Sequence, residues 1–182
     1  MNTSTLIATI IPAALVLVAL AAGLWLFTRR RNLQRQFGPE YDRTAEAAGS
    51  RMAADRELRA RQQRHDTFEI KDLPAERRTE YAEEWRGVQE AFVDRPEGSV
   101  ARADELVSRL MRERGYPADG FDGQLRDLSV EHGRTLEHYR AAHEVNVRSG
   151  EGETTTEELR GAMVHYRALF DDLLTNTNQG SR

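Results

Sequence analysis

The amino-acid sequence predicts an all-α protein with a single N-terminal transmembrane helix, a helical stalk and an antiparallel helical bundle of about four helices. Three observations lead to this fold class. A charge-free apolar segment opens the chain, apolar residues recur at helical spacing in its C-terminal half, and glycine or proline separates these periodic stretches. We expect a transmembrane anchor over residues 1–28, a basic juxtamembrane stalk and linker over 29–73, a helical bundle over 74–176 and a disordered tail over 177–182.

The predicted anchor runs from Leu6 to Phe27, which is 22 positions without a charged side chain. About 20 apolar residues cross a bilayer as a helix. Pro12 falls in the first turns, where a missing amide proton costs least. Trp25 and Phe27 stand where an aromatic belt would meet the headgroups. We therefore expect residues 6–27 to have the lipid bilayer as their partner.

The charges that flank the anchor predict its direction. None precedes it, and four arginines follow it at Arg29, Arg30, Arg31 and Arg35. The positive-inside rule then gives a single-pass protein of the cell membrane, with its N-terminus outside and its C-terminal domain in the cytoplasm. Anionic headgroups attract such arginines by about 1 kcal/mol each. Together with Trp25 they are the predicted membrane-interface residues.

A cleaved secretory signal is the alternative for the same segment, and it would reverse the compartment. Ala19-Leu20-Ala21 has the form of a cleavage site. The residues before the apolar run carry no positive charge, however, and the run continues past this site to Phe27. Both features favour an uncleaved anchor.

The stretch after the anchor is basic although the whole chain has a net charge of −4. Residues 29–64 hold ten arginines against five acids, and the remainder holds sixteen basic against twenty-five acidic residues. Acids interleave the later arginines and no aromatic platform accompanies them, so a nucleic-acid partner is not expected.

Residues 40–64 are strong helix formers that follow a hinge at Phe37-Gly38-Pro39. Their apolar positions are small or sparse, and Gly49-Ser50 interrupts them. This pattern predicts a solvated stalk with a reach of about 35 to 40 Å. A dimeric coiled coil would need apolar heptads that do not continue past Met52. Residues 67–73 then form a linker that ends before Pro74.

Three periodic stretches predict the bundle helices that follow. The first covers about residues 74–93 and the second about 97–114, where Gly115 ends it. A near-heptad seam from Leu125 to His143 is the longest pattern, and its residues are Leu125, Leu128, His132, Leu136, Tyr139 and His143. A last helix is expected after Thr155, which forms a capping box with Glu158.

Four sequence segments give the chain a resemblance to known sequences, and they are FGPEYDR, EWRGVQEAFVDRP, DLSVEHGRTLEHYRAAHE and TEELRGAMVHYRALFDDLL. It resembles a group of uncharacterised actinobacterial membrane-anchored proteins, often described as hypothetical membrane or secreted proteins. The resemblance covers the basic stretch and nearly all of the soluble part. It implies no biochemical function and no active-site residues, because the group has none assigned.

Histidines of the last two predicted helices are the only residues that invite a chemical hypothesis, and they are His132, His138, His143 and His165. Eleven residues, or about 16 Å of helix, separate His132 from His143, so these two cannot share a metal ion. None of the four has the glutamate three positions earlier that a ferritin-like site requires. They are interpreted as polar seam or surface residues. A partner-binding face and a site completed by another helix remain alternatives.

Other motifs favour no chemistry. The segment Asp119-Gly120-Phe121-Asp122-Gly123 lacks the alternating ligands of a calcium loop, and Gly150-Glu151-Gly152 lacks the strand and third glycine of a phosphate loop. The absence of cysteine excludes disulfides and thiolate sites. No catalytic, cofactor or metal residues are predicted, and no cofactor is expected.

The sequence therefore predicts a membrane-tethered, non-enzymatic interaction or scaffold module with an unknown protein partner. Its oligomeric state is open, with a homo-oligomer as one alternative. The alternative function is an enzyme or sensor whose histidine and carboxylate groups meet between bundle helices. A structure in which His132, His143 or His165 converge with acids around a pocket would favour that alternative.

Overall fold

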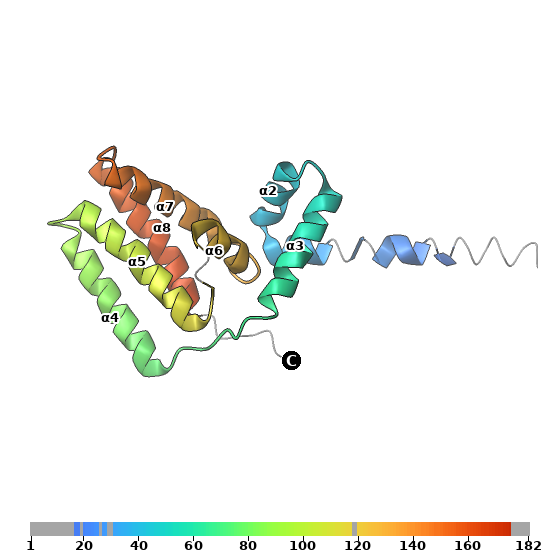
Figure 1. The fold of residues 1–182 in the computed structure, drawn as a ribbon, viewed down its shortest axis with the longest axis horizontal. Helices are drawn as coiled ribbons and strands as arrows, with labels where there is room; N and C mark the ends of the chain where they lie inside the picture. Colours follow the sequence, from blue (N-terminus) through green and yellow to red (C-terminus); the bar gives the residue numbers. More distant parts are fainter. Residues whose placement is uncertain (1–16, 19, 26, 29–30, 118–119, 176–182) are drawn as a thin grey trace, which may run out of the picture.

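The computed structural model describes residues 17–18, 20–25, 27–28, 31–117 and 120–175. These residues form helices joined by turns and loops, without a strand, which confirms the all-α class. Residues 31–37 are helical and lead into the first labelled helix (Figure 1). The labelled helices are α2 (Pro39–Ala47), α3 (Arg51–His65), α4 (Ala75–Ala91), α5 (Pro96–Arg114), α6 (Gly120–Leu128), α7 (Leu136–Gly150) and α8 (Thr156–Thr175).

The bundle is organised around α5, which packs against α4, α7 and α8, while α7 and α8 pack against each other (Figure 1). Trp85 of α4 is 2% exposed and stacks on Phe170 of α8, with ring centroids 4.7 Å apart. The predicted helices over 74–93 and 97–114 are confirmed as α4 and α5. Burying their apolar faces in one shared core is the main source of stability.

The start of α8 confirms the predicted capping box. The backbone amide of Glu158 donates to Oγ1 of Thr155 over 3.3 Å, and the Thr155 amide donates to a Glu158 carboxylate oxygen over 2.8 Å. These reciprocal bonds satisfy two amides at the start of the helix that have no partner within it.

The prediction of one long seam from Leu125 to His143 is wrong, because the chain turns between α6 and α7. Gly133 lies in this turn, and a Cβ atom added there would be 2.7 Å from the backbone oxygen of Phe37. Glycine at this position thus lets two backbone segments approach more closely than a residue with a Cβ atom would allow. His132 lies in this turn and is buried against Tyr116 and Asp172, which come from distant parts of the sequence that periodicity cannot connect.

The prediction of an extended, solvated stalk is also wrong. Gly49 adopts a positive φ and Ser50 caps α3, so α2 and α3 form a hairpin that packs on the bundle beside α6 (Figure 1). A second hydrophobic cluster closes this contact, and it consists of Leu33, Phe37, Tyr41, Leu58 and Val130. Four of these five residues come from the predicted stalk region. Its sparse apolar residues are therefore a small core rather than a solvated surface.

Ion pairs complete the contact between the hairpin and the bundle. Glu40, 4% exposed, accepts hydrogen bonds from both terminal nitrogens of Arg140, at 2.8 and 3.0 Å, and one from Arg61 at 3.1 Å. Arg64 of α3 reaches Asp127 of α6 at 3.0 Å. A carboxylate as buried as that of Glu40 requires such partners. The hairpin is accordingly held by charges as well as by apolar packing.

Most of the predicted anchor, together with Arg29 and Arg30, lies outside the described residues, as does the tail predicted for 177–182. Among the helices that the structure describes, none combines the length and the apolar character needed to cross a membrane.

Candidate functional site

A buried polar cluster lies where the turn between α6 and α7 meets α8. The Nδ1 atom of His132 is 2.8 Å from Oδ2 of Asp172, and its Nε2 atom is 3.1 Å from the hydroxyl of Tyr116. The Tyr116 hydroxyl donates to a carboxylate oxygen of Glu131 over 2.8 Å, and Thr135 donates to Asp172 over 2.9 Å. The name polar cluster is used below for His132, Asp172, Tyr116, Glu131 and Thr135.

Three side-chain contacts of the polar cluster run in line from Asp172 through His132 and Tyr116 to Glu131. They connect α8, the turn before α7 and the loop before α6.

Burial and hydrogen bonding shift the pKa values in the cluster in opposite directions. Burial, reinforced by the nearby Glu131 carboxylate, raises the pKa of the Tyr116 phenol well above its usual value. Burial disfavours the ionised form of Asp172, but the hydrogen bonds from His132 and Thr135 and the charge of Arg114 outweigh it, so the pKa of Asp172 is lowered. Asp172 is thus an anion held by its donors.

The polar cluster borders a cavity of about 380 Å³ between the bundle and the helix that precedes α2. We call this cavity the junction pocket, and its lining residues are Arg35, Gln36, Glu131, His132, Gly133, Arg134, Thr135 and Asp172. His132 is 1% exposed and both of its ring nitrogens are engaged within the protein. It is therefore not poised as a general base for a molecule in the pocket.

The other three histidines singled out in the sequence, His138, His143 and His165, do not join this cluster. His143 lies 3.3 Å from Asp104 and stacks on Phe121, with ring centroids 3.8 Å apart. His138 of α7 and His165 of α8 are paired through their Nδ1 atoms at 2.9 Å. Burial and the neighbouring His138 lower the pKa of His165. Within the described ranges, no three metal-ligating side chains of histidine, cysteine, aspartate or glutamate come together.

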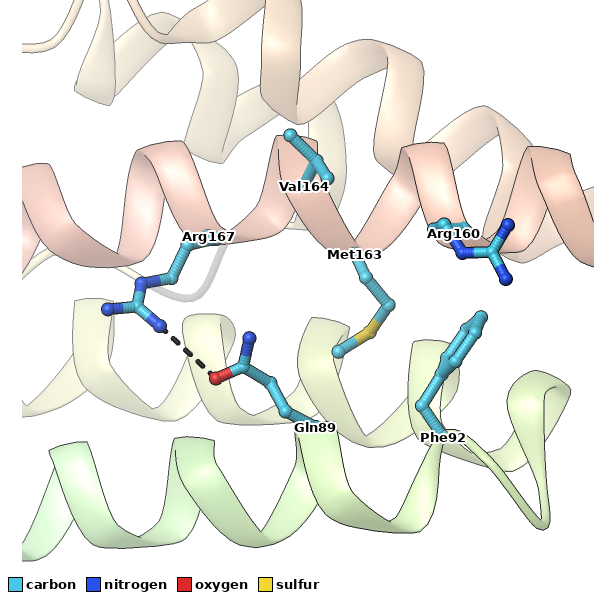
Figure 2. A pocket seen from close by; sticks show the side chains of 6 residues that line it. All are labelled: Gln89, Phe92, Arg160, Met163, Val164 and Arg167. Carbon is cyan, nitrogen blue, oxygen red and sulfur yellow. Dashed lines mark hydrogen bonds between the residues drawn. The ribbon is translucent and has the colours of Figure 1, made fainter.

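A groove between α4 and α8 is the second candidate site (Figure 2). Its volume is about 250 Å³ and its lining residues are Gln89, Phe92, Arg160, Met163, Val164 and Arg167. Val164 is 64% exposed, and Arg167 donates to the Gln89 side chain across the groove over 3.2 Å. The groove thus combines an apolar middle with two arginines that are two helical turns apart on α8.

The residues predicted at the membrane interface are placed only in part. Trp25, Arg31 and Arg35 are exposed, and Arg35 lines the junction pocket. Arg134, which lies in the same pocket, was not predicted there. Ninety-nine residues separate these two arginines in the sequence, so no local pattern could have joined them.

The fold and these sites define a helical-bundle protein on which the hairpin of α2 and α3 is docked. Comparisons with protein-family models, with curated proteins and with solved structures find no match to this chain. The resemblance to actinobacterial membrane-anchored proteins therefore stays a prediction, and functional arguments must come from the chain itself.

Proposed function

We propose that the chain is a membrane-tethered, non-enzymatic interaction module whose anchor spans residues 6–27 and whose bundle faces the cytoplasm. One observation carries the proposal. The large apolar side chains described between residues 17 and 27 are all 57 to 67% exposed, and they are Leu17, Val18, Leu20, Leu24, Trp25 and Phe27. Such a row needs an apolar environment that this chain does not itself provide. A lipid bilayer followed by cytoplasmic arginines meets that need.

Reporter fusions after Arg182 test both anchorage and direction. Alkaline phosphatase fused there should be inactive and green fluorescent protein should be fluorescent, while the chain should stay in the membrane fraction at alkaline pH. Replacing the four arginines at 29, 30, 31 and 35 by neutral residues, and adding lysines beside Asn2, should invert a fraction of the molecules. An active phosphatase fusion to the native chain, or a mature N-terminus near Ala22, would overturn the cytoplasmic assignment.

The groove between α4 and α8 is the surface that we assign to the protein partner. Its apolar middle between Arg160 and Arg167 fits an amphipathic helix that carries an apolar anchor residue flanked by acids. Among the described residues, the carboxylate partners of both arginines form exposed ion pairs with them, Glu157 with Arg160 and Asp171 with Arg167. Exposed pairs are worth little, so a partner's carboxylates can replace them.

A photo-crosslinking residue at Val164 tests the chemistry of this partner in living cells. The crosslinked peptide should contain an apolar residue with aspartate or glutamate within two helical turns. The matched position is Val147, which is also exposed but lies on α7 and does not line the groove. A basic peptide, a peptide of this chain itself, or equal capture from both positions would exclude the proposed occupant.

A sensor is the second candidate function, and the polar cluster favours it over an enzyme. The cluster joins α8 to the loop before α6 and to the turn before α7, and both ring nitrogens of His132 are engaged within it. A sensing role predicts that weakening the cluster by Asp172→Asn lowers the hydrogen-exchange protection of α2 and α3 as well as that of α8. Unchanged protection of α2 and α3 in this variant would exclude it.

A further inference from the structure

Two arginines of the junction pocket, Arg35 and Arg134, differ from its carboxylates in their partners among the described residues. The carboxylates in the pocket are engaged, because Asp172 accepts from His132 and Thr135 and Glu131 accepts from Tyr116. Arg35 and Arg134, by contrast, have no carboxylate within ion-pair distance in the part of the chain that the structure describes. The pocket therefore has an excess of hydrogen-bond donors, which suits an anion.

The local fold brings Arg134 beside the helix that carries Arg35. A Cβ atom added to Gly38 would lie 3.9 Å from Cγ of Arg134, so the stem of Arg134 runs along the turn that ends residues 31–37. The preceding residue, Gly133, packs closely against the backbone of Phe37. This contact places the backbone of Arg134 beside the turn.

With the anchor proposed above, the pocket would lie at a depth that suits a lipid headgroup. Arg35 is eight residues beyond Phe27 in the sequence, and eight residues would span about 12 Å in an α-helix. The headgroup layer adds about 5 to 8 Å to each side of the hydrocarbon core. Helical side chains lean toward the N-terminus, and an arginine at Arg35 can therefore reach back to phosphates at this level.

We propose that the junction pocket binds the phosphate of an anionic phospholipid between the guanidinium groups of Arg35 and Arg134. Guanidinium groups bind phosphate through paired hydrogen bonds, and a cavity of about 380 Å³ has the size of a small-molecule site. This inference rests on the proposed membrane anchor. The recognised chemistry is a phosphate ester anion, which a lipid headgroup or a free phosphate compound could supply.

Full-length protein in nanodiscs tests the proposal. Nanodiscs of phosphatidylcholine alone are compared with nanodiscs that contain phosphatidylglycerol, by the unfolding midpoint of the bundle and by native mass spectrometry of retained lipid. Phosphatidylglycerol should raise the midpoint of the native chain. Arg134→Gln should bind this lipid about tenfold more weakly, as expected when one of two arginine contacts is lost. Arg134→Lys should fall between the two, since it keeps the charge and loses the fork.

Arg102→Gln is the matched control, because Arg102 is exposed on α5 and does not line the pocket. Equal losses in Arg102→Gln and Arg134→Gln would mean a general charge effect and would overturn the site. So would an Arg134→Gln protein that keeps native circular dichroism and native lipid binding. If Arg134→Gln does not fold, the lipid binding of Arg134→Lys tests the site in its place. An Arg134→Lys protein that binds the lipid as tightly as the native chain would also overturn the site.

A separate titration of the detergent-solubilised chain with inorganic phosphate distinguishes the source of the anion. One outcome is that phosphate stabilises the native chain saturably and Arg134→Gln removes this effect, while phosphatidylglycerol is not preferred over phosphatidylcholine. That result would identify a free phosphate compound, and not a lipid, as the ligand of the pocket. Flotation with phosphatidylcholine vesicles monitors the anchor independently. Failure to float would reject the proposed function, while the phosphate titration would still decide on the pocket.

Discussion

The Nδ1 atom of His132 lies 2.8 Å from Oδ2 of Asp172, and this contact ties the turn between α6 and α7 to the last turns of α8. Forty residues separate the two partners. Because the contact is partly buried and Asp172 is ionised, losing one partner removes a charge-assisted hydrogen bond from the other. The same contact forms the inner wall of the junction pocket, so stability and the proposed lipid site depend on common residues.

Asp172→Asn should therefore destabilise the protein by about 2 to 3 kcal/mol, since a buried donor loses its charged acceptor. The preceding residue supplies the control. Asp171 makes an exposed pair with Arg167, and Asp171→Asn should cost less than about 1 kcal/mol. Urea unfolding monitored by circular dichroism measures both changes. Similar costs for the two variants would contradict the importance of the polar cluster.

Trp85→Ala should cost about 3 to 5 kcal/mol, because it removes a large buried ring and its stacking partner Phe170. Val93 follows the same helix but is mostly exposed, so Val93→Ala should change stability by less than about 0.5 kcal/mol. A loss below about 1 kcal/mol for Trp85→Ala would mean that this face of α4 is not part of the core.

Two glycine substitutions should change the stability of the protein in opposite directions. In Gly133→Ala the new methyl group would meet the Phe37 backbone oxygen at 2.7 Å, and we expect a loss of about 1 to 3 kcal/mol. Gly87 is exposed in the middle of α4 with open space around it, and Gly87→Ala should stabilise by about 0.5 to 1 kcal/mol. Thermal unfolding of both variants tests the tight contact at the turn.

Acid should weaken the packing of α4 on α5. A hydrogen bond from Arg77, opposed by burial and aided by one from Tyr81, lowers the pKa of Glu113 to about 2. The folded-state pKa is below the ordinary value of 4.5, so the contribution of Glu113 is complete above that pH and is lost as the pH falls toward 2. In Glu113→Gln, stability should vary less with pH over this window. Glu105→Gln, an exposed change on the same helix, should keep the native pH profile.

The sequence predicted α4, α5 and the start of α8 because their signals are local. Apolar residues at spacings of three and four mark a buried face, and caps such as Thr155 act on their own helix. The hairpin gave no such signal. Its cluster takes Leu33 and Phe37 from residues 31–37, Tyr41 from α2 and Leu58 from α3, and Val130 closes it, so α2 and α3 each contribute only one of its residues.

The sites were harder to predict than the helices for the same reason. His132 fits the heptad spacing of a seam, and only its distant partner Asp172 shows that it belongs to a turn. Arg35 was predicted at the membrane interface from the charges beside the anchor. The sequence around Arg134 does not distinguish it from other surface arginines, and only the fold shows that it lines the same pocket.

Under the membrane anchor proposed above, the docked hairpin of α2 and α3 limits the space that the bundle can explore. An extended stalk would let the bundle of an anchored chain move far from the membrane surface. A docked hairpin would keep the bundle close to that surface. A partner would then be met mainly by lateral diffusion in two dimensions, where even weak affinity is multiplied by a high local concentration. Proteins that share the same membrane are consequently favoured over freely diffusing ones, and lengthening the connection at Gly49 should reduce that advantage.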